Sequence, residues 1–125
     1  MTKKILIIDD DKIFSKVLRD ALLAKEKDAY EVTTAFDGKE GLEIASKVKP
    51  DLILCDLVMP NMGGIDFIKQ LRSEEWGKLL KVVVVTQISD IEKMSEGLEL
   101  GIHGYILKSD YSIDEILHQI EEALK

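Results

Sequence analysis

The sequence contains a single cysteine, two prolines and no long apolar run, and these scarcities exclude several classes of protein. Cys55 cannot form an internal disulfide, which fits a protein of the reducing cytoplasm. No stretch approaches the roughly 18 apolar residues of a membrane-spanning helix. The first residues carry no small-residue cleavage site of the kind that ends a signal peptide. We therefore expect a cytoplasmic protein with no membrane association.

Basic residues are also scarce relative to acidic ones. The chain has 17 lysines and arginines against 24 aspartates and glutamates, which gives a net charge of −7. Because a surface that binds nucleic acid needs a basic patch or stripe, we expect no nucleic-acid partner. Most of the acids fit a solvated surface, but four of them directly follow apolar runs: Asp9, Asp10, Asp11 and Asp56.

Short apolar runs recur along the 125 residues. Continuous β-branched or apolar runs are typical of strands that are buried on both faces of a parallel sheet. Four such runs occur, at residues 5–8, 52–55, 82–85 and 105–107. The segment 30–35 mixes polar and apolar positions, which favours an edge strand.

Between these runs, apolar residues recur every three or four positions, which indicates amphipathic helices. The stripes are Phe14, Leu18 and Leu22; Leu42, Ala45 and Val48; Ile65, Ile68 and Leu71; Ile91, Met94 and Leu98; and Ile113, Ile116, Leu117, Ile120 and Leu124. Asp11, Asp37 and Ser112 are placed as N-caps, and Gly101 follows the fourth stripe as a stop signal.

Five strands that alternate with five helices predict a doubly wound α/β fold of the flavodoxin type. Its five-stranded parallel sheet would have the order 2-1-3-4-5, with helices on both faces. No linker or low-complexity segment interrupts the pattern. We therefore expect one domain over residues 1–125 and no output domain.

Acidic side chains follow two strands that would be neighbours in this sheet. Ligands of open α/β sheets bind at the carboxyl ends of the strands, where the strand order reverses. Asp9 and Asp10 follow the first strand and Asp56 follows the third, so their carboxylates should meet in one crevice. Carboxylates about 4–5 Å apart repel by roughly 3–4 kcal/mol at an effective dielectric of 20. The cluster therefore predicts a site for a hard divalent cation such as Mg²⁺, and a bound Mg²⁺ can also bind phosphate oxygens.

Two other polar residues complete the expected site. Thr86 ends the fourth strand, and Lys108 follows the fifth. A hydroxyl and an ammonium can each bind a phosphoryl oxygen, so with Asp56 as the nucleophile the set is suited to phosphoryl transfer. The expected product is an acyl phosphate on Asp56.

Over essentially its whole length the chain resembles the receiver domain of two-component response regulators, in the manner of stand-alone chemotaxis-type regulators. The residues that carry the resemblance are Ile7-Ile8-Asp9-Asp10, Asp56-Leu57-Val58-Met59-Pro60, Gly64, Thr86, Tyr105 and Lys108. Each motif alone is weakly specific, but their order and spacing on one α/β frame are strongly specific.

The resemblance implies how the metal and the phosphoryl group would be held. Asp56 would be the phosphoacceptor and would also bind Mg²⁺. Asp10 and the main-chain carbonyl of Val58 would bind the metal directly, whereas Asp9 would act through metal-bound water. Lys108 would contact the phosphoryl group.

The resemblance also implies a switch and its partners. Thr86 would move toward the phosphoryl group, Tyr105 would change its packing, and the loop 87–90 would be the segment with two arrangements. The phosphodonor would be a sensor histidine kinase or a phosphotransfer protein. A protein target would bind the face formed by the fourth helix, the fifth strand and the fifth helix. The chain would not be an enzyme beyond promoting its own phosphorylation and dephosphorylation.

Three residues depart from the family pattern. Ser109 follows the lysine where the family often has a proline after a cis peptide bond, so the loop that positions Lys108 is expected to differ. Gln87 follows the threonine where a small residue is common, and Val58 offers no polar side chain to an attacking water. We therefore hypothesise slow self-dephosphorylation.

Two alternatives stay open at this point. Asp9-x-Asp11 after the first strand also resembles a small haloacid-dehalogenase-like phosphatase, with Asp9 as the nucleophile and Asp11 as the acid/base. In that interpretation Asp56 has no role. The other alternative is a receiver-like protein that never takes up phosphate and works only as a protein-binding module.

Overall fold

The computed structural model describes residues 2–25 and 28–125. In these residues five parallel strands form one sheet with the order β2-β1-β3-β4-β5. The strands are β1 (Lys3–Ile8), β2 (Tyr30–Ala35), β3 (Leu52–Cys55), β4 (Val82–Thr86) and β5 (Gly104–Leu107). The predicted order is confirmed, and β2 is an edge strand as its mixed pattern indicated.

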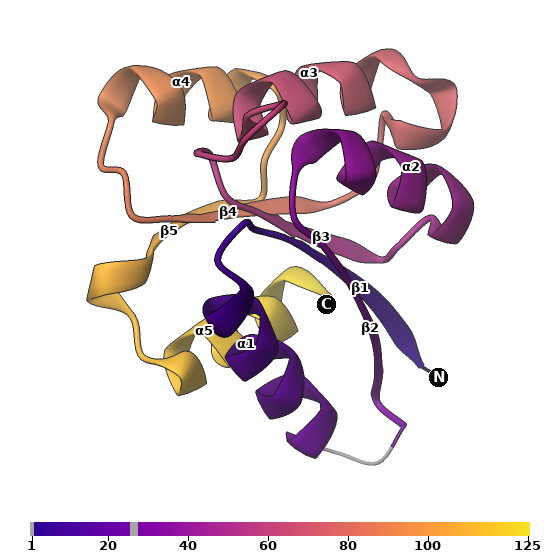
Figure 1. The fold of residues 1–125 in the computed structure, drawn as a ribbon, viewed down its shortest axis with the longest axis vertical. Helices are drawn as coiled ribbons and strands as arrows, with labels where there is room; N and C mark the ends of the chain where they lie inside the picture. The colour runs from indigo at the N-terminus through magenta and orange to yellow at the C-terminus, as the bar shows by residue number, and fades with distance from the viewer. Residues whose placement is uncertain (1, 26–27) are drawn as a thin grey trace.

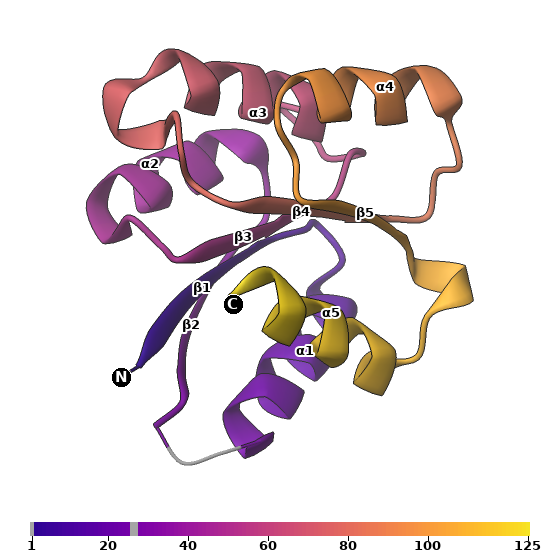
Figure 2. The same cartoon turned by 180° about the vertical axis from the view of Figure 1, so that it is seen from behind.

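Helices cover both faces of the sheet, as Figures 1 and 2 show. On one face lie α1 (Lys12–Lys25) and α5 (Ile113–Ala123); on the other lie α2 (Gly38–Val48), α3 (Gly64–Ser73) and α4 (Ile91–Glu99). Two single turns of 3-10 helix, η1 (Glu75–Gly77) and η2 (Lys108–Asp110), follow α3 and β5. The doubly wound α/β fold is therefore confirmed.

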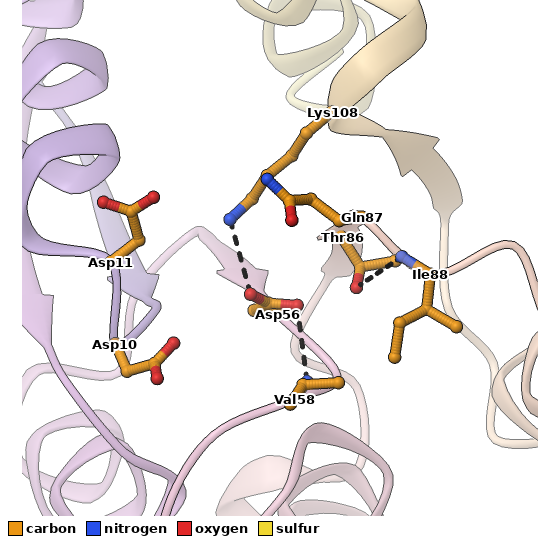
Figure 3. A pocket seen from close by; sticks show the side chains of 8 residues that line it. All are labelled: Asp10, Asp11, Asp56, Val58, Thr86, Gln87, Ile88 and Lys108. Carbon is orange, nitrogen blue, oxygen red and sulfur yellow. Dashed lines mark hydrogen bonds and ion pairs between the residues drawn. The ribbon is translucent and has the colours of Figure 1, made fainter.

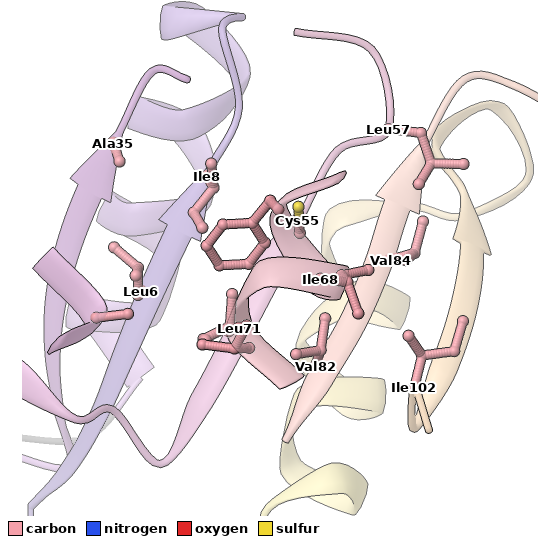
Figure 4. Packing of buried hydrophobic residues seen from close by; sticks show 13 residues of the cluster. Leu6, Ile8, Ala35, Cys55, Leu57, Ile68, Leu71, Val82, Val84 and Ile102 are labelled. Atoms are coloured by element: carbon pink, nitrogen blue, oxygen red, sulfur yellow. The ribbon is translucent and has the colours of Figure 1, made fainter. Parts of the chain in front are cut away.

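The buried side chains form one hydrophobic cluster on each face of the sheet. Figure 4 shows the cluster beneath α2 and α3, where Ile68 and Leu71 of α3 lie against Val82 of β4. All residues of β3 and β4 are buried, because helices pack against both of their faces. The rigid centre of the sheet thus fixes the positions at which β1, β3 and β4 end.

Side chains at the helix ends confirm the predicted caps. Asp37 accepts a hydrogen bond from the backbone N–H of Glu40 at the start of α2. Ser112 and Glu115 form a reciprocal capping box at the start of α5. Gly101 follows α4 with φ +79°, a conformation that favours glycine because it lacks a Cβ.

The apolar stripe of α4 marks a helix but not a buried face. Ile91 is 82% exposed and Leu98 is 59% exposed, so the stripe does not enter the core as such stripes usually do. The buried position of α4 is instead Gly97, where an added Cβ would lie 2.8 Å from the Ile102 side chain. Similarly, only Ile106 of β5 is buried, because β5 is at the edge of the sheet and not between two strands.

Arg72 of α3 holds the far end of α4 in place. Its guanidinium group donates hydrogen bonds to the carbonyl oxygens of Leu100 and Gly101 after α4, and to those of Gly77 and Leu80 before β4. Charged donors make stronger hydrogen bonds than neutral ones, so this end of α4 is firmly tied. In the described part of the chain, no helix has the length and apolar character to cross a membrane.

Candidate functional site

Two acidic residues leave the sheet side by side at its carboxyl edge. Ile8 pairs with Cys55 in the register of β1 and β3, so Asp9 and Asp56 follow at the same level. The Asp56 N–H donates to the Ile8 carbonyl at 2.9 Å, and the Asp9 N–H donates to the Ala35 carbonyl at 3.0 Å. The backbone of the sheet therefore fixes where both carboxylates begin.

The predicted acidic cluster is present. One carboxylate oxygen from each of Asp9, Asp10 and Asp56 lies within 4.8 Å of the other two. Asp9 is 2% exposed and Asp56 is 8% exposed, whereas Asp10 is on the surface. Charged carboxylates are rarely buried unless a cation or hydrogen-bond donor compensates them, so the cluster needs positive charge.

Lys108 supplies part of that charge. Its Nζ lies 2.7 Å from Oδ2 of Asp9 and 3.3 Å from Oδ2 of Asp56; Figure 3 shows its side chain directed at Asp56. The Lys108 side chain is 8% exposed. Although Ser109 replaces the proline that often follows the lysine, Lys108 still reaches the pocket from the first position of η2.

The pKa values of Asp9 and Lys108 are both raised, but for different reasons. Burial raises the pKa of Asp9 to about 6, with a further contribution from the charge of Asp56, although the ammonium of Lys108 opposes the shift. Burial also disfavours the Lys108 ammonium, but hydrogen bonds and attraction to Asp9 and Asp56 outweigh it and raise the pKa of Lys108. Lys108 therefore stays protonated at neutral pH.

Backbone groups hold the carboxylate of Asp56 from the other side. Its Oδ1 accepts hydrogen bonds from the N–H groups of Leu57 at 2.7 Å and Val58 at 3.4 Å. Gly64, the first residue of α3, lies against the same backbone and donates its N–H to the Leu57 carbonyl at 3.0 Å. A Cβ on Gly64 would lie 2.2 Å from the Asp56 carbonyl oxygen, so only glycine allows this approach.

A pocket of about 330 Å³ opens beside Asp56. The described residues that line it are Asp10, Asp11, Asp56, Val58, Thr86, Gln87, Ile88 and Lys108. Asp9 is buried and paired with Lys108, whereas Asp56 borders the pocket. This arrangement gives a ligand access to Asp56 and disfavours Asp9 as the nucleophile of a phosphatase. Asp11 accepts the backbone N–H of Phe14 at 3.0 Å, as expected of a helix cap.

The loop after β4 connects the pocket to β5. Thr86 is fully buried, and its Oγ1 accepts a hydrogen bond from the N–H of Ile88 at 3.3 Å. The hydroxyl of Tyr105 donates to the carbonyl of the same residue, Ile88. Burial raises the pKa of Tyr105. Thr86 therefore holds the N–H group of Ile88, and Tyr105 holds its carbonyl group.

Two residues of the site were not singled out from the sequence. Ile88 lines the pocket, donates its N–H to Thr86 and accepts the hydroxyl of Tyr105, but the sequence placed it only within the loop 87–90, because nothing in its residue type distinguishes it from other loop residues. The ring of Phe14 lies with its centroid 4.3 Å from the Lys108 ammonium. Its place in the apolar stripe of α1 indicated only core packing, because a stripe does not tell which residue ends beside a charged group.

The donor atoms at the cluster fit Mg²⁺. They are all oxygens, which suits a hard cation that is held by one or two carboxylates and keeps several waters. Asp10 is exposed beside the two buried acids, so a hydrated ion could approach from the solvent side. These residues are compatible with the metal that the acidic cluster predicts.

Together, the fold and the pocket define a class of doubly wound α/β domains that carry acidic residues at the carboxyl edge of the sheet. The chain belongs to the response regulator receiver domain family, whose family model matches residues 5–121. Members of the family are signalling switches of two-component systems, have a phosphoacceptor role and generally bind Mg²⁺. Their partners are in general kinases or phosphotransfer proteins.

Known proteins similar to this chain agree with this assignment. It is 34% identical over 123 residues to the transcriptional regulatory protein YdfI of Bacillus subtilis, and 36% identical over 126 residues to the alkaline phosphatase synthesis transcriptional regulatory protein PhoP of the same organism. The matches cover 98% and 100% of this chain but 55% and 50% of those proteins, so the chain spans about half of their length.

Solved structures give the same result for the fold. The chemotaxis protein CheY4 of Vibrio cholerae superposes with a TM-score of 0.89 at 30% identity, and the match covers 99% of this chain and 100% of that one. A CheY-like receiver domain protein of Methanospirillum hungatei also gives 0.89, at 27% identity, and covers 99% and 94%.

Proposed function

We propose that Asp56 accepts a phosphoryl group from a sensor histidine kinase or phosphotransfer protein in the cytoplasm, and that phosphorylation changes the affinity of the chain for a protein partner. The observation that supports this most directly is the position of the Asp56 carboxylate, which borders the pocket between the acidic cluster and the Lys108 ammonium. An exposed strand-end acid outside such a cluster would have no means of balancing the added charge.

The transfer is a direct displacement at phosphorus. A carboxylate oxygen of Asp56 forms the new P–O bond, and the bond from phosphorus to the donor nitrogen or oxygen breaks, with its electron pair staying on the leaving group. Lys108 holds an ammonium near the place where charge builds up on the phosphoryl oxygens. The backbone N–H groups of Leu57 and Val58 orient the attacking carboxylate.

Asp10, Asp56 and the main-chain carbonyl of Val58 would hold Mg²⁺, with Asp9 acting through metal-bound water. When bound, the metal supplies positive charge that offsets both the carboxylates and the incoming phosphoryl group. Asp9 and Lys108 already pair at 2.7 Å, so Asp9 also keeps the ammonium close to Asp56.

The switch would act through the segment 87–90 between β4 and α4. A phosphoryl group on Asp56 adds acceptors to which the hydroxyl of Thr86 can donate its hydrogen, and a movement of Thr86 toward them would alter its present contact, in which it accepts the N–H of Ile88. Because Tyr105 bonds the Ile88 carbonyl, a shift of that residue changes the environment of Tyr105. The face of α4, β5 and α5, which carries the exposed Ile91 and Leu98, would present the change to a target.

The position of the acceptor is the decisive test. We expect acetyl phosphate with Mg²⁺ to place one phosphoryl group on Asp56, located by borohydride reduction and mass spectrometry. Beryllofluoride with Mg²⁺ should perturb NMR signals around the same residue. A label on Asp9 would support the phosphatase alternative, and no Mg²⁺-dependent change with either reagent would support the protein-binding module.

We expect Thr86→Ala to be labelled on Asp56 within about threefold of the parent's rate, because a hydroxyl contact is only one of several to the phosphoryl group. The variant should nevertheless lose the response of Tyr105. With 3-fluorotyrosine in all three tyrosine positions, beryllofluoride should shift the Tyr105 ¹⁹F signal in the parent, assigned with Tyr105→Phe, but not in Thr86→Ala. Thr86→Ser keeps the hydroxyl and is the control. A normal shift in Thr86→Ala would contradict the switch mechanism.

A further inference from the structure

We propose that Phe14 of α1 is a positioning residue for phosphoryl transfer, because the face of its ring holds the Lys108 ammonium beside Asp56. The proposal rests on the proposed function and adds to it a residue whose side chain has no polar atom. The ring centroid lies 4.3 Å from Nζ of Lys108, which is well within the range of a cation–π contact.

Within the described part of the chain, the ammonium of Lys108 has three close partners of two different kinds. Two are the carboxylates of Asp9 and Asp56, at 2.7 Å and 3.3 Å. The third is the ring of Phe14, which brings attraction without a formal charge. The Lys108 side chain is 8% exposed, so few water molecules compete with these contacts.

The carboxylate partners change during the reaction, whereas the ring does not. When Asp56 becomes an acyl phosphate it loses its carboxylate charge, and the ammonium must move its contact to a phosphoryl oxygen. Asp9 is also drawn into the metal site in the proposed function. Of the close partners of Lys108 among residues 2–25 and 28–125, Phe14 alone keeps the same charge and covalent structure throughout the reaction.

Such a contact matters for Lys108 because the residues that follow it in the chain do not pack around its side chain. It begins the single 3-10 turn η2, whose other two residues, Ser109 and Asp110, are exposed. A lysine side chain also has many rotamers, so holding Nζ in one place costs conformational entropy. Contact with the fixed ring of Phe14 restricts the Lys108 side chain to fewer rotamers before the phosphodonor binds.

Phe14 is itself held in place from two directions. Its backbone N–H donates to Oδ1 of Asp11 at 3.0 Å, which closes the first turn of α1. Its ring packs against the hydrophobic cluster that includes Leu18 of the same helix. The ring is thus part of the rigid layer on the α1 and α5 side of the sheet, with one face turned to Lys108.

The competing explanation is that Phe14 only fills space, as aromatic residues on helix stripes usually do. Fluorinated phenylalanines separate the two, because each fluorine weakens the negative potential of the ring face while the ring keeps nearly the same shape. A packing role is insensitive to this series. If the ring holds the ammonium, the strength of the contact, and with it the labelling rate of Asp56, should fall with each added fluorine.

The experiment places mono-, di- and trifluorinated phenylalanine at position 14 of the whole chain and measures labelling of Asp56 by acetyl phosphate at saturating Mg²⁺. We expect the labelling rate to fall with each fluorine, to about threefold to tenfold below the parent for the trifluorinated ring. The melting temperature should fall by no more than a few degrees across the series, because the ring keeps its shape and only one contact weakens.

The chain contains a matched control. Nζ of Lys12 lies 5.0 Å from the ring centroid of Phe36, outside the residues that line the pocket. The same analogues at position 36 should leave the labelling rate unchanged. A general effect of fluorinated residues on folding would slow both series and would overturn the proposal.

The outcomes distinguish this proposal from the proposed function. A graded fall at position 14 alone supports the role of Phe14. Equal labelling rates across the series at position 14 overturn that role and leave phosphorylation of Asp56 intact. A parent that takes up no label at Asp56 overturns the proposed function and the role of Phe14 together. In that case ring-current shifts of the Lys108 side-chain protons, lost in Phe14→Leu, would still show the contact.

Discussion

Replacing Gly64 with alanine should lower the free energy of unfolding by about 3 kcal/mol, the upper part of the range for overpacking a rigid interior. The new Cβ would lie 2.2 Å from the Asp56 carbonyl oxygen, 2.8 Å from Cα of Leu57 and 3.0 Å from the carbonyl carbon of Asp56. These are backbone atoms at the end of a buried strand, so no side-chain rotation relieves the overlap. Alanine normally stabilises a helix relative to glycine by about 1 kcal/mol, which is too little to compensate.

Equilibrium unfolding in urea measures this effect, with an unchanged slope against denaturant showing that the same cooperative unit unfolds. Gly104→Ala is the matched control, because a Cβ there would lie 3.7 Å and 3.9 Å from side-chain atoms of Val83, an ordinary contact. That variant should stay within about 1 kcal/mol of the parent. A Gly64→Ala protein as stable as the parent would mean that α3 does not press on the Asp56 backbone.

Asp10→Asn should change metal affinity and metal-free stability in opposite directions. An Asp10 oxygen lies within 4.8 Å of oxygens from Asp9 and Asp56, so the three charges repel one another when no cation is present. Removing one charge should raise the melting temperature of the metal-free protein by about 3 °C. In the proposed function Asp10 is a direct ligand, so the same change should weaken Mg²⁺ binding by about 100-fold.

Calorimetric titration with Mg²⁺ and thermal unfolding in the presence of a chelator measure the two effects. Asp11→Asn is the matched control, since Asp11 is next in the chain and borders the pocket but does not belong to the three-carboxylate cluster. Asparagine also caps helices well, so α1 should be unaffected. If both substitutions weaken Mg²⁺ binding equally, the cluster is not the metal site.

The sequence predicted the fold and the acidic cluster because both follow from short-range patterns. Continuous apolar runs marked β1, β3 and β4, whose burial on both faces permits little else than apolar residues. Once the strand order was inferred, Asp9 and Asp56 had to meet, because β1 and β3 are adjacent and end at the same level. Thr86 and Lys108 were found in the same way, from the ends of β4 and β5.

The features that the sequence did not predict depend on tertiary contacts. The stripe of Ile91, Met94 and Leu98 has the spacing of a core face, yet the approach of α4 to the sheet is set by Gly97. The proximity of Phe14 to Lys108 joins residues 94 positions apart, counting from 14 to 108, and no local pattern reports it. The contact of Tyr105 with Ile88 likewise depends on how one loop folds over an edge strand.

The single cysteine, Cys55, is placed so that its reactivity reports on opening of the folded structure. The thiol is fully buried at the end of β3, and burial together with the charges of Asp56 and Asp9 raises its pKa, so the reactive thiolate does not form in the folded state. An alkylating reagent can reach the sulfur only after the structure around Cys55 has opened. The alkylation rate of Cys55 therefore reports how often the native state opens, and no cysteine has to be introduced for the measurement.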